Sequence, residues 1–246
     1  MTPVKFKGIY EFSFGGILLG RMGVELEQDA DHYSLTGDIM SAGLANLFVR
    51  HTSHTEVQGS GHGFIYPQVH YESHYQTRKK KHYVRLVSRN GEIHEEEQKP
   101  PRRKDDIPVP QSMKKDTSDP LSLLIHIRRG VFEARKAGKP GFSLHMYDGN
   151  RLTGVDVTME GEKTLAYGSG QVNVVQVGLR RKPLAGYSPS ELAEYDPQEP
   201  TLHGWLSDDG RLMPIRLQTS FLMTPLVARL VKECRTGESC LLGLKE

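Results

Sequence analysis

The chain has 246 residues, of which 37% are hydrophobic and 25% are charged, and its formal net charge at pH 7 is +2. This composition is typical of a globular chain that buries a core, and it excludes an intrinsically disordered protein. The small net charge gives no strong attraction to nucleic acid or to anionic membranes, and no apolar run approaches the eighteen residues of a membrane-spanning helix.

The first forty residues alternate between apolar and polar side chains, as β-strands with one buried face do. In residues 4–14 the apolar face holds Val4, Phe6, Gly8, Tyr10, Phe12 and Phe14. Gly15-Gly16 then indicates a hairpin. The next strand places Leu18, Met22, Val24 and Leu26 on one face, and residues 33–39 alternate again. The pattern predicts an antiparallel meander without βαβ units.

Residues 41–98 continue the strand pattern after one short helical turn that we expect around 44–48. Three extended runs follow between 64 and 98, and Asn90-Gly91 is the strongest hairpin signal in the chain. Residues 99–118 contain four prolines and mixed charge without periodicity, so they predict a mobile loop within a single β domain of residues 1–246. The alternative is a division into two domains at this loop, with the N-terminal meander as the first. Acidic residues dilute the lysines and arginines of this loop, which argues against nucleic-acid binding.

One helix is predicted after this loop. Asp119 suits the N-cap and Pro120 the first helical position. The following turns are apolar nearly all round, which predicts burial of Leu121, Leu123, Leu124, Ile125 and Ile127. Arg128 and Arg129 suit an exposed end of this segment, and Gly130 is a candidate break or kink. Strands are expected again at 141–148, 151–160, 164–181, 201–208, 211–221 and 224–234.

Six of the eleven histidines lie between His51 and His82, which raises the question of a metal site. In a strand, His70, Glu72 and His74 share a face, but the two histidine Cα atoms are about 13 Å apart. One ion cannot comfortably bind both, although His70 with Glu72 could hold a metal weakly. The H-E-x-x-H pattern of zinc proteases is not met. A polar strand face is the favoured interpretation.

Two short glycine-rich segments do not form nucleotide or hydrolase motifs. Gly168-Ser169-Gly170 lacks the G-x-S-x-G spacing of a nucleophile elbow. Residues 59–63 lack the lysine and following helix of a phosphate-binding loop. Both segments are interpreted as turns, so the sequence singles out no catalytic residue and no cofactor.

The two cysteines, Cys234 and Cys240, flank a predicted turn that could place them opposite each other. A disulfide there would stabilise the fold by about 2 kcal/mol in the chain-entropy model. It would form in an oxidising compartment and stay reduced in the cytosol, and the composition leaves both compartments open. The spacing does not suit a C-x-x-C redox pair.

Four segments carry a resemblance to a known family: "DPLSLLIHIR", "YDGNRLTGVDV", "KPLAGY" and "SDDGRLMPIRLQTSFLMTPLVARL". They resemble an uncharacterised family of bacterial envelope proteins, a domain of unknown function, over nearly the whole chain. The resemblance implies a periplasmic protein whose signal peptide is absent from this sequence. It also implies a long antiparallel sheet curved around a helix, similar to the lipoprotein carriers of the LolA and LolB type.

These observations predict a mainly β fold, an incomplete or spiral barrel wrapped around one apolar helix, with Leu123, Leu124 and Ile127 against its concave face. The expected function is a non-catalytic binding or scaffolding module of the periplasm. Its expected partner is an apolar small molecule or another envelope protein. The alternative is a metal-dependent or hydrolytic enzyme that uses the histidines between His51 and His82.

Overall fold

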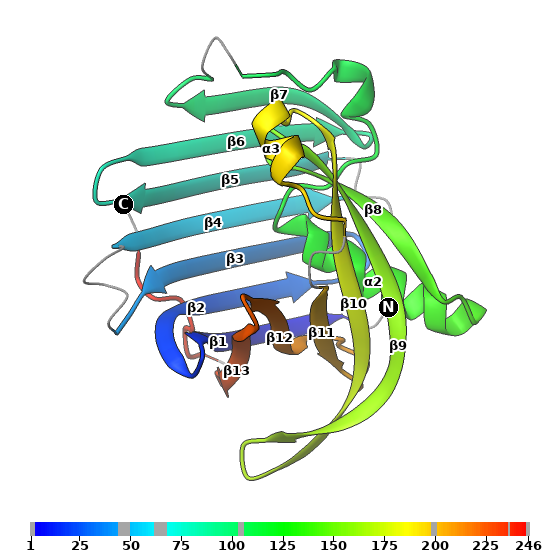
Figure 1. Ribbon diagram of the computed structural model, residues 1–246. Coiled ribbons are helices and arrows are strands. Elements are labelled where there is room, and N and C mark those ends of the chain that lie inside the picture. Colours follow the sequence, from blue (N-terminus) through cyan, green and yellow to red (C-terminus); the bar gives the residue numbers. More distant parts are fainter. Residues whose placement is uncertain are drawn as a thin grey trace.

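The computed structural model describes residues 3–43, 50–61, 68–102, 106–197, 201–235 and 237–244. Thirteen antiparallel strands in these ranges form one sheet that does not close (Figure 1), in the order β7-β6-β5-β4-β3-β2-β1-β13-β12-β11-β10-β9-β8. The first seven are β1 Val4–Phe14, β2 Ile17–Gln28, β3 His32–Ser41, β4 His51–Ser60, β5 Gln68–Thr77, β6 Lys81–Arg89 and β7 Glu92–Lys99. The others are β8 Gly141–Tyr147, β9 Leu152–Tyr167, β10 Gly170–Ala185, β11 Leu202–Ser207, β12 Pro214–Phe221 and β13 Thr224–Glu233.

The expected curved antiparallel sheet is confirmed, and its inner face follows the alternation in the sequence. Val4, Phe6 and Tyr10 of β1 are buried at 2–3% exposure. The hairpin signals are also confirmed, because Gly15-Gly16 and Asn90-Gly91 occupy two-residue turns with positive φ at both positions. The helical turn expected around 44–48 lies outside the described residues.

Helix α2, Ser122–Ala137, lies between the layer of β1–β7 and the arm of β8–β10 that crosses it (Figure 1). Its side chains contribute to two cores. Ile125 joins Leu26 and Leu35 on one side, whereas Ile127 and Val131 pack among the valines of β9 and β10 on the other. The sheet therefore wraps around the helix, as the sequence predicts. No helix in the described ranges is long and apolar enough to span a bilayer.

The start of α2 differs from the prediction by two residues. The helix begins at Ser122, not at Pro120, and Leu121 occupies the formal cap position. Asp119 nevertheless binds the free amides, since its Oδ1 accepts hydrogen bonds from the backbone nitrogens of Leu121 and Ser122 at 2.9 and 2.8 Å. Burial raises the pKa of the Asp119 carboxyl.

Two further predictions for α2 are wrong. Gly130 does not break the helix, which continues to Ala137. Gly130 instead makes room for the ring of Phe142, because a Cβ at this position would lie 2.3 Å from that ring. Arg128 is not at an exposed end but is fully buried, with its Nε donating to the backbone oxygen of Arg211 at 2.7 Å. The prediction failed because α2 packs against protein on two sides, so the helix surface at Arg128 does not face solvent.

The segment between β7 and α2 connects the two open edges of the sheet. Lys115 forms a bridge with Glu92 of β7, and Ser118 forms a parallel bridge with Met146 of β8. A short 3-10 helix, η1 Gln111–Met113, lies within this segment, and the side chains of Val109 and Lys114 are buried. We call residues 109–118 the seam segment. The mobility predicted for 99–118 stays a prediction.

The strand boundaries of the C-terminal half differ from the prediction. The single strand expected at 164–181 is divided, since residues 164–167 end β9, a turn follows at Gly168-Ser169, and β10 begins at Gly170. β9 continues through residues 161–163, where a break was expected, because Gly161 at φ 95° absorbs a β-bulge opposite Gln176 and Val177. β12 begins at Pro214 and not at 211. A short helix that was not predicted, α3 Pro189–Glu194, follows β10.

Candidate ligand cavity beside helix α2

A cavity of about 550 Å³ lies between the first turn of α2 and the wall formed by β8–β12. We call it the helix-side cavity. Its apolar lining consists of Leu123, Met146, Val155, Leu179 and Leu202. Its polar lining consists of Asp148, Arg151, Thr153, Arg180, Arg181, Tyr187, Asp196 and Thr219. The volume lies within the roughly 300–1,000 Å³ of typical small-molecule sites, but the eight polar residues of the lining are more than the few that such sites usually have.

Strand register explains the apolar wall of this cavity. Leu179 of β10 pairs with Leu202 of β11 and with Val157 of β9, so these side chains share one face of the sheet. Further along the same face, Val155 and Val157 pack in the core that contains Ile127 and Val131 of α2. Leu123, one turn before Ile127, remains half-buried. The helix therefore fills the curved sheet at Ile127 and leaves space at Leu123.

The polar end of the cavity is organised around Arg151 and Tyr187. The Arg151 guanidinium lies 5.5 Å from the centre of the Tyr187 ring and also pairs with Glu191 of α3. The Tyr187 hydroxyl is 2.6 Å from Oγ1 of Thr153. A second cavity of about 310 Å³ shares Arg151 and Tyr187 with the first, as well as Arg181 and Asp196. The two cavities therefore adjoin at these residues, and we call the second one the polar vestibule.

Gly186 places Tyr187 at this position. Its φ is 79°, and a Cβ there would lie 2.3 Å from the backbone oxygen of Asn150, so only glycine fits. The chain then enters α3 through a capping box between Ser188 and Glu191. Hydrogen bonds from Ser188 lower the pKa of the Glu191 carboxyl, and Arg151 lowers it further. Two of the segments that carried the family resemblance, 147–157 and 182–187, thus meet at the cavity.

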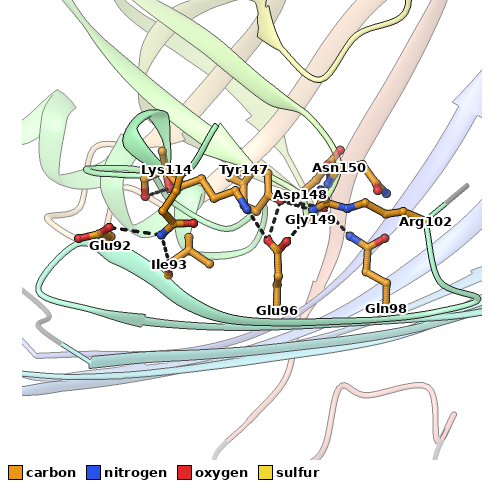
Figure 2. Close-up of polar contacts among 12 residues, drawn as sticks. Glu92, Ile93, Glu96, Gln98, Arg102, Lys114, Tyr147, Asp148, Gly149 and Asn150 are labelled. Carbon is orange, nitrogen blue, oxygen red and sulfur yellow. Dashed lines mark hydrogen bonds and ion pairs between the residues drawn. The ribbon is translucent and has the colours of Figure 1, made fainter. Parts of the chain in front are cut away.

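A polar cluster at the seam holds β8 beside β7 (Figure 2). The Glu96 carboxylate accepts hydrogen bonds from Lys114 Nζ at 2.8 Å, Tyr147 OH at 2.8 Å and Arg102 Nη2 at 3.0 Å. Burial alone would raise the pKa of Glu96, but the bonds from Lys114 and Tyr147 hold it below its usual value. The backbone oxygen of Gly149 accepts from Arg102 and Gln98. These contacts fix residues 147–151, from which Asp148 and Arg151 reach the cavity.

Of the described histidines that raised the question of a metal site, His54, His70 and His74 lie on the outer face of the sheet. His51 and His82 lie on the opposite face, where Tyr75 stacks on the His82 ring. None of these five lines the helix-side cavity, and His62 lies outside the described residues. Glu72 is 3.3 Å from Arg85, and the His74 ring lies 4.6 Å from the Tyr83 ring. His70 is exposed. Within the described ranges, no three His, Cys, Asp or Glu side chains gather in an arrangement that could hold a metal ion.

One pair on this outer face was missed by the sequence analysis. Nδ1 of His54 is 2.6 Å from Oδ1 of the buried Asp38. The other carboxylate oxygen of Asp38 accepts from the backbone nitrogen of Leu242 in the C-terminal segment. His54 and His74, which are paired across β4 and β5, line a surface pocket of about 360 Å³. The pairing of β3 with β4 brings Asp38 and His54 together, and Leu242, 204 residues from Asp38 in the sequence, holds the carboxylate. No local sequence motif indicates either contact.

The C-terminal segment is attached by a disulfide. Cys234 and Cys240 are bonded, with their Cα atoms 6.0 Å apart. Within the loop closed by the disulfide, Oγ of Ser239 donates to Oε1 of Glu25 at 2.7 Å, and the backbone nitrogen of Cys240 donates to the same oxygen at 2.8 Å. Gly23 permits this close approach, since a Cβ there would lie 2.1 Å from the backbone oxygen of Cys240.

A family model described as "Protein of unknown function (DUF3108)" matches residues 9–231, which is most of the chain. The chain belongs to the DUF3108 family. The resemblance to a domain of unknown function is thus confirmed at the level of the family. No curated protein matches this DUF3108 chain.

A solved structure shares the fold. It is described as a β-barrel-like protein of the domain of unknown function DUF1849 from Brucella abortus, with a TM-score of 0.62 and 11% sequence identity. The match covers 97% of the DUF3108 chain and 100% of the other chain. At this identity the likeness establishes a β-barrel-like fold alone.

Proposed function

We propose that this DUF3108 protein is a non-catalytic binding module of the bacterial cell envelope that holds an apolar or amphiphilic small molecule in the helix-side cavity. The observation that carries the proposal is the unfilled apolar space beside Leu123. Leu179 and Leu202 would contact an acyl or other hydrocarbon group, and the vestibule around Arg151 and Tyr187 would face a polar headgroup. The likeness to lipoprotein carriers of the LolA and LolB type, which the sequence led us to expect, is also part of this proposal.

The disulfide supports the periplasm as the compartment. Disulfides persist in oxidising compartments and are rare in the cytosol. The Cys234–Cys240 bond anchors the segment that contacts Glu25 and Asp38. Titration of free thiols in protein extracted from native cells under alkylating conditions tests this compartment directly. Two free thiols per chain would contradict it.

Binding of a fluorescent fatty acid tests the cavity. We expect saturable binding at one site per chain, displaced by unlabelled fatty acid. Leu179→Trp fills the cavity from its wall and should weaken binding at least about tenfold, as expected when a buried apolar contact surface of this size is lost. Thr158→Trp is the matched control, because Thr158 lies on the same β9–β10 hairpin and is exposed. No binding, or equal weakening by both substitutions, would contradict the proposal.

The rival function is a metal-dependent or hydrolytic enzyme that uses the histidines between His51 and His82. Its specific support is the hydrogen bond between Asp38 and His54 at the edge of a pocket, because a carboxylate that orients a histidine is a common general-base arrangement. Hydrolysis of an activated aryl ester by the wild type, lost in both Asp38→Asn and His54→Gln, would favour the enzyme. If all three proteins hydrolyse the ester no faster than buffer does, the Asp38–His54 pair does not catalyse this hydrolysis.

A further inference from the structure

The turn between β12 and β13 exposes large apolar side chains. Phe221, Leu222 and Met223 are 64%, 82% and 96% exposed. The turn has positive φ at both central positions, 47° at Leu222 and 63° at Met223. Two-residue turns of this type favour Asn and Gly, and bulky residues occupy them only at a cost in free energy. The chain thus keeps two unfavourable residues at its most exposed apolar position, as functional sites often do.

A second apolar hairpin lies beside this turn. Ile17, at the start of β2, is 54% exposed. The backbone nitrogen of Gly15 donates to the oxygen of Pro225 at 3.0 Å, and Phe14 pairs with both Ile17 and Leu226. We call Ile17, Phe221, Leu222 and Met223 the apolar tip. It is formed by segments about 200 residues apart in sequence, so only the fold assembles it.

The same end of the sheet is basic. The β5–β6 turn contains Arg78, Lys79, Lys80 and Lys81, all exposed. Register places this turn at the end that carries the apolar tip, since Gly20 pairs with Ser41 and His51 pairs with Thr77. Along the sheet edge, the basic turn is four strand spacings of roughly 4.8 Å, about 19 Å, from the β1–β2 turn, and six spacings, about 29 Å, from the β12–β13 turn. Exposed Arg50, just before β4, lies at this end between them.

The opposite end of the same strands carries charges of both signs. The β2–β3 turn contains Asp29 and Asp31, whereas at the β6–β7 turn Asp116 lies beside exposed Lys115 and Arg89. The small net charge of +2 therefore coexists with a local excess of positive charge at the β5–β6 turn. In the described turns that carry the apolar tip and the basic residues, no acidic residue occurs.

We propose that this basic, apolar-tipped end of the sheet docks on the surface of an anionic lipid bilayer. The apolar tip enters the interface, and the basic turn contacts the headgroups. Apolar insertion and basic residues near an anionic surface are the two contributions that hold peripheral proteins on membranes. This surface uses none of the residues that line the helix-side cavity, so the inference stands without the proposed function.

Flotation with vesicles of phosphatidylcholine, with and without phosphatidylglycerol, tests the inference on the full chain. We expect the wild type to bind only the anionic vesicles and to lose most of that binding in high salt, because salt screens exposed charges. Failure of the wild type to bind anionic vesicles would overturn the proposal. Equal binding to both vesicle types would overturn the role of the basic turn.

Leu222→Asn combined with Met223→Gly is the decisive variant. It removes two apolar side chains and installs the residue pair that this turn favours, so the thermal midpoint should stay equal or rise. Vesicle binding should fall at least about tenfold, given the apolar area lost. Phe132→Ser removes an exposed apolar side chain from α2 and should leave binding unchanged.

The basic turn has its own variant. Lys79→Glu with Lys80→Glu should abolish binding to anionic vesicles. Lys136→Glu with Lys139→Glu, which changes two exposed lysines at and just beyond the C-terminal end of α2, should not. Light scattering of the same proteins tests whether the apolar tip instead binds a second copy of the chain. If the wild type forms dimers that Leu222→Asn with Met223→Gly dissolves, and neither binds vesicles, the apolar tip joins two copies of the chain and the membrane proposal is wrong.

Discussion

Arg128 shows how a single side chain can connect distant parts of this fold. It lies on α2 with no exposed surface, and its Nη1 donates to Oε1 of Gln28 at 2.6 Å while its Nε donates to the backbone of Arg211. It therefore joins the helix to the end of β2 and to the turn before β12. Buried hydrogen bonds to a charged group contribute more than neutral ones, and their acceptors become costly when left unpaired.

We expect Arg128→Ala to lower the free energy of unfolding by about 3 kcal/mol, from the lost hydrogen bonds and the space left in the core. Chemical denaturation measures this change. Arg129→Ala is the comparison, because Arg129 is adjacent on the helix but only partly buried. Equal losses in the two variants would show that burial of Arg128 does not matter.

His126 should make stability depend on pH. Burial, with a smaller contribution from Arg129, lowers its pKa from 6.5 to about 4. Between these values the unfolded chain binds a proton that the folded chain does not, so stability falls as the pH falls. Going from pH 7 to pH 5 should cost at most about 2 kcal/mol. His126→Leu should lose this part of the pH dependence, and denaturation of both proteins at pH 7 and pH 5 measures the difference. If the variant kept the same pH dependence of stability, His126 would not be its source.

At the scale of elements, the seam segment decides whether the sheet stays wrapped around α2. The β7 and β8 edges are joined through the bridges of Lys115 and Ser118, through the hydrogen bonds to the Glu96 carboxylate, and through the bond from Gln98 to Gly149. Lys114 is 7% exposed at its side chain, so its partner carboxylate compensates a buried charge. Removing one partner of such a pair is costly because the other charge stays buried.

Glu96→Gln should therefore destabilise the fold by about 2 kcal/mol and speed amide exchange in β8. Because the pKa of Glu96 is lowered in the folded state, its contribution is present at neutral pH and is lost as the solution is acidified below its usual pKa. Exchange measured by mass spectrometry reports both effects. Glu97→Gln, which alters an exposed ion pair with Lys99, should change exchange in β8 little.

At the scale of the molecule, β1 and β13 join the two halves of the chain into one sheet. Tyr10 pairs with Leu230, and the Tyr10 hydroxyl donates to the backbone oxygen of Pro214. If the chain were divided into two domains at residues 99–118, β1 and β13 would not pair with each other, and each would become the edge of a separate sheet. We therefore expect the single domain predicted from sequence to unfold in one calorimetric transition. Two separate transitions, or a stable fragment of residues 1–98, would contradict this.

The sequence by itself determined the β class, the hairpins and the helix inside the sheet, because each follows from local periodicity or turn chemistry. Alternation in residues 4–14 specifies one buried face whatever its partner strand is. The prediction for Arg128 failed for the same reason: local pattern places a charged residue outside, and its burial depends on contacts with Gln28 of β2 and Arg211 before β12, which are distant in the sequence.

Tertiary structure alone decided the cavity, the Asp38–His54 pair and the apolar tip. The cavity depends on how far α2 fills the curved sheet, which is a matter of volume rather than of sequence pattern. The pair and the tip depend on strand register between segments far apart in the chain, and a shift of one residue would turn each side chain to the other face. Register is fixed only when all thirteen strands pack together, and these candidate sites become visible only then.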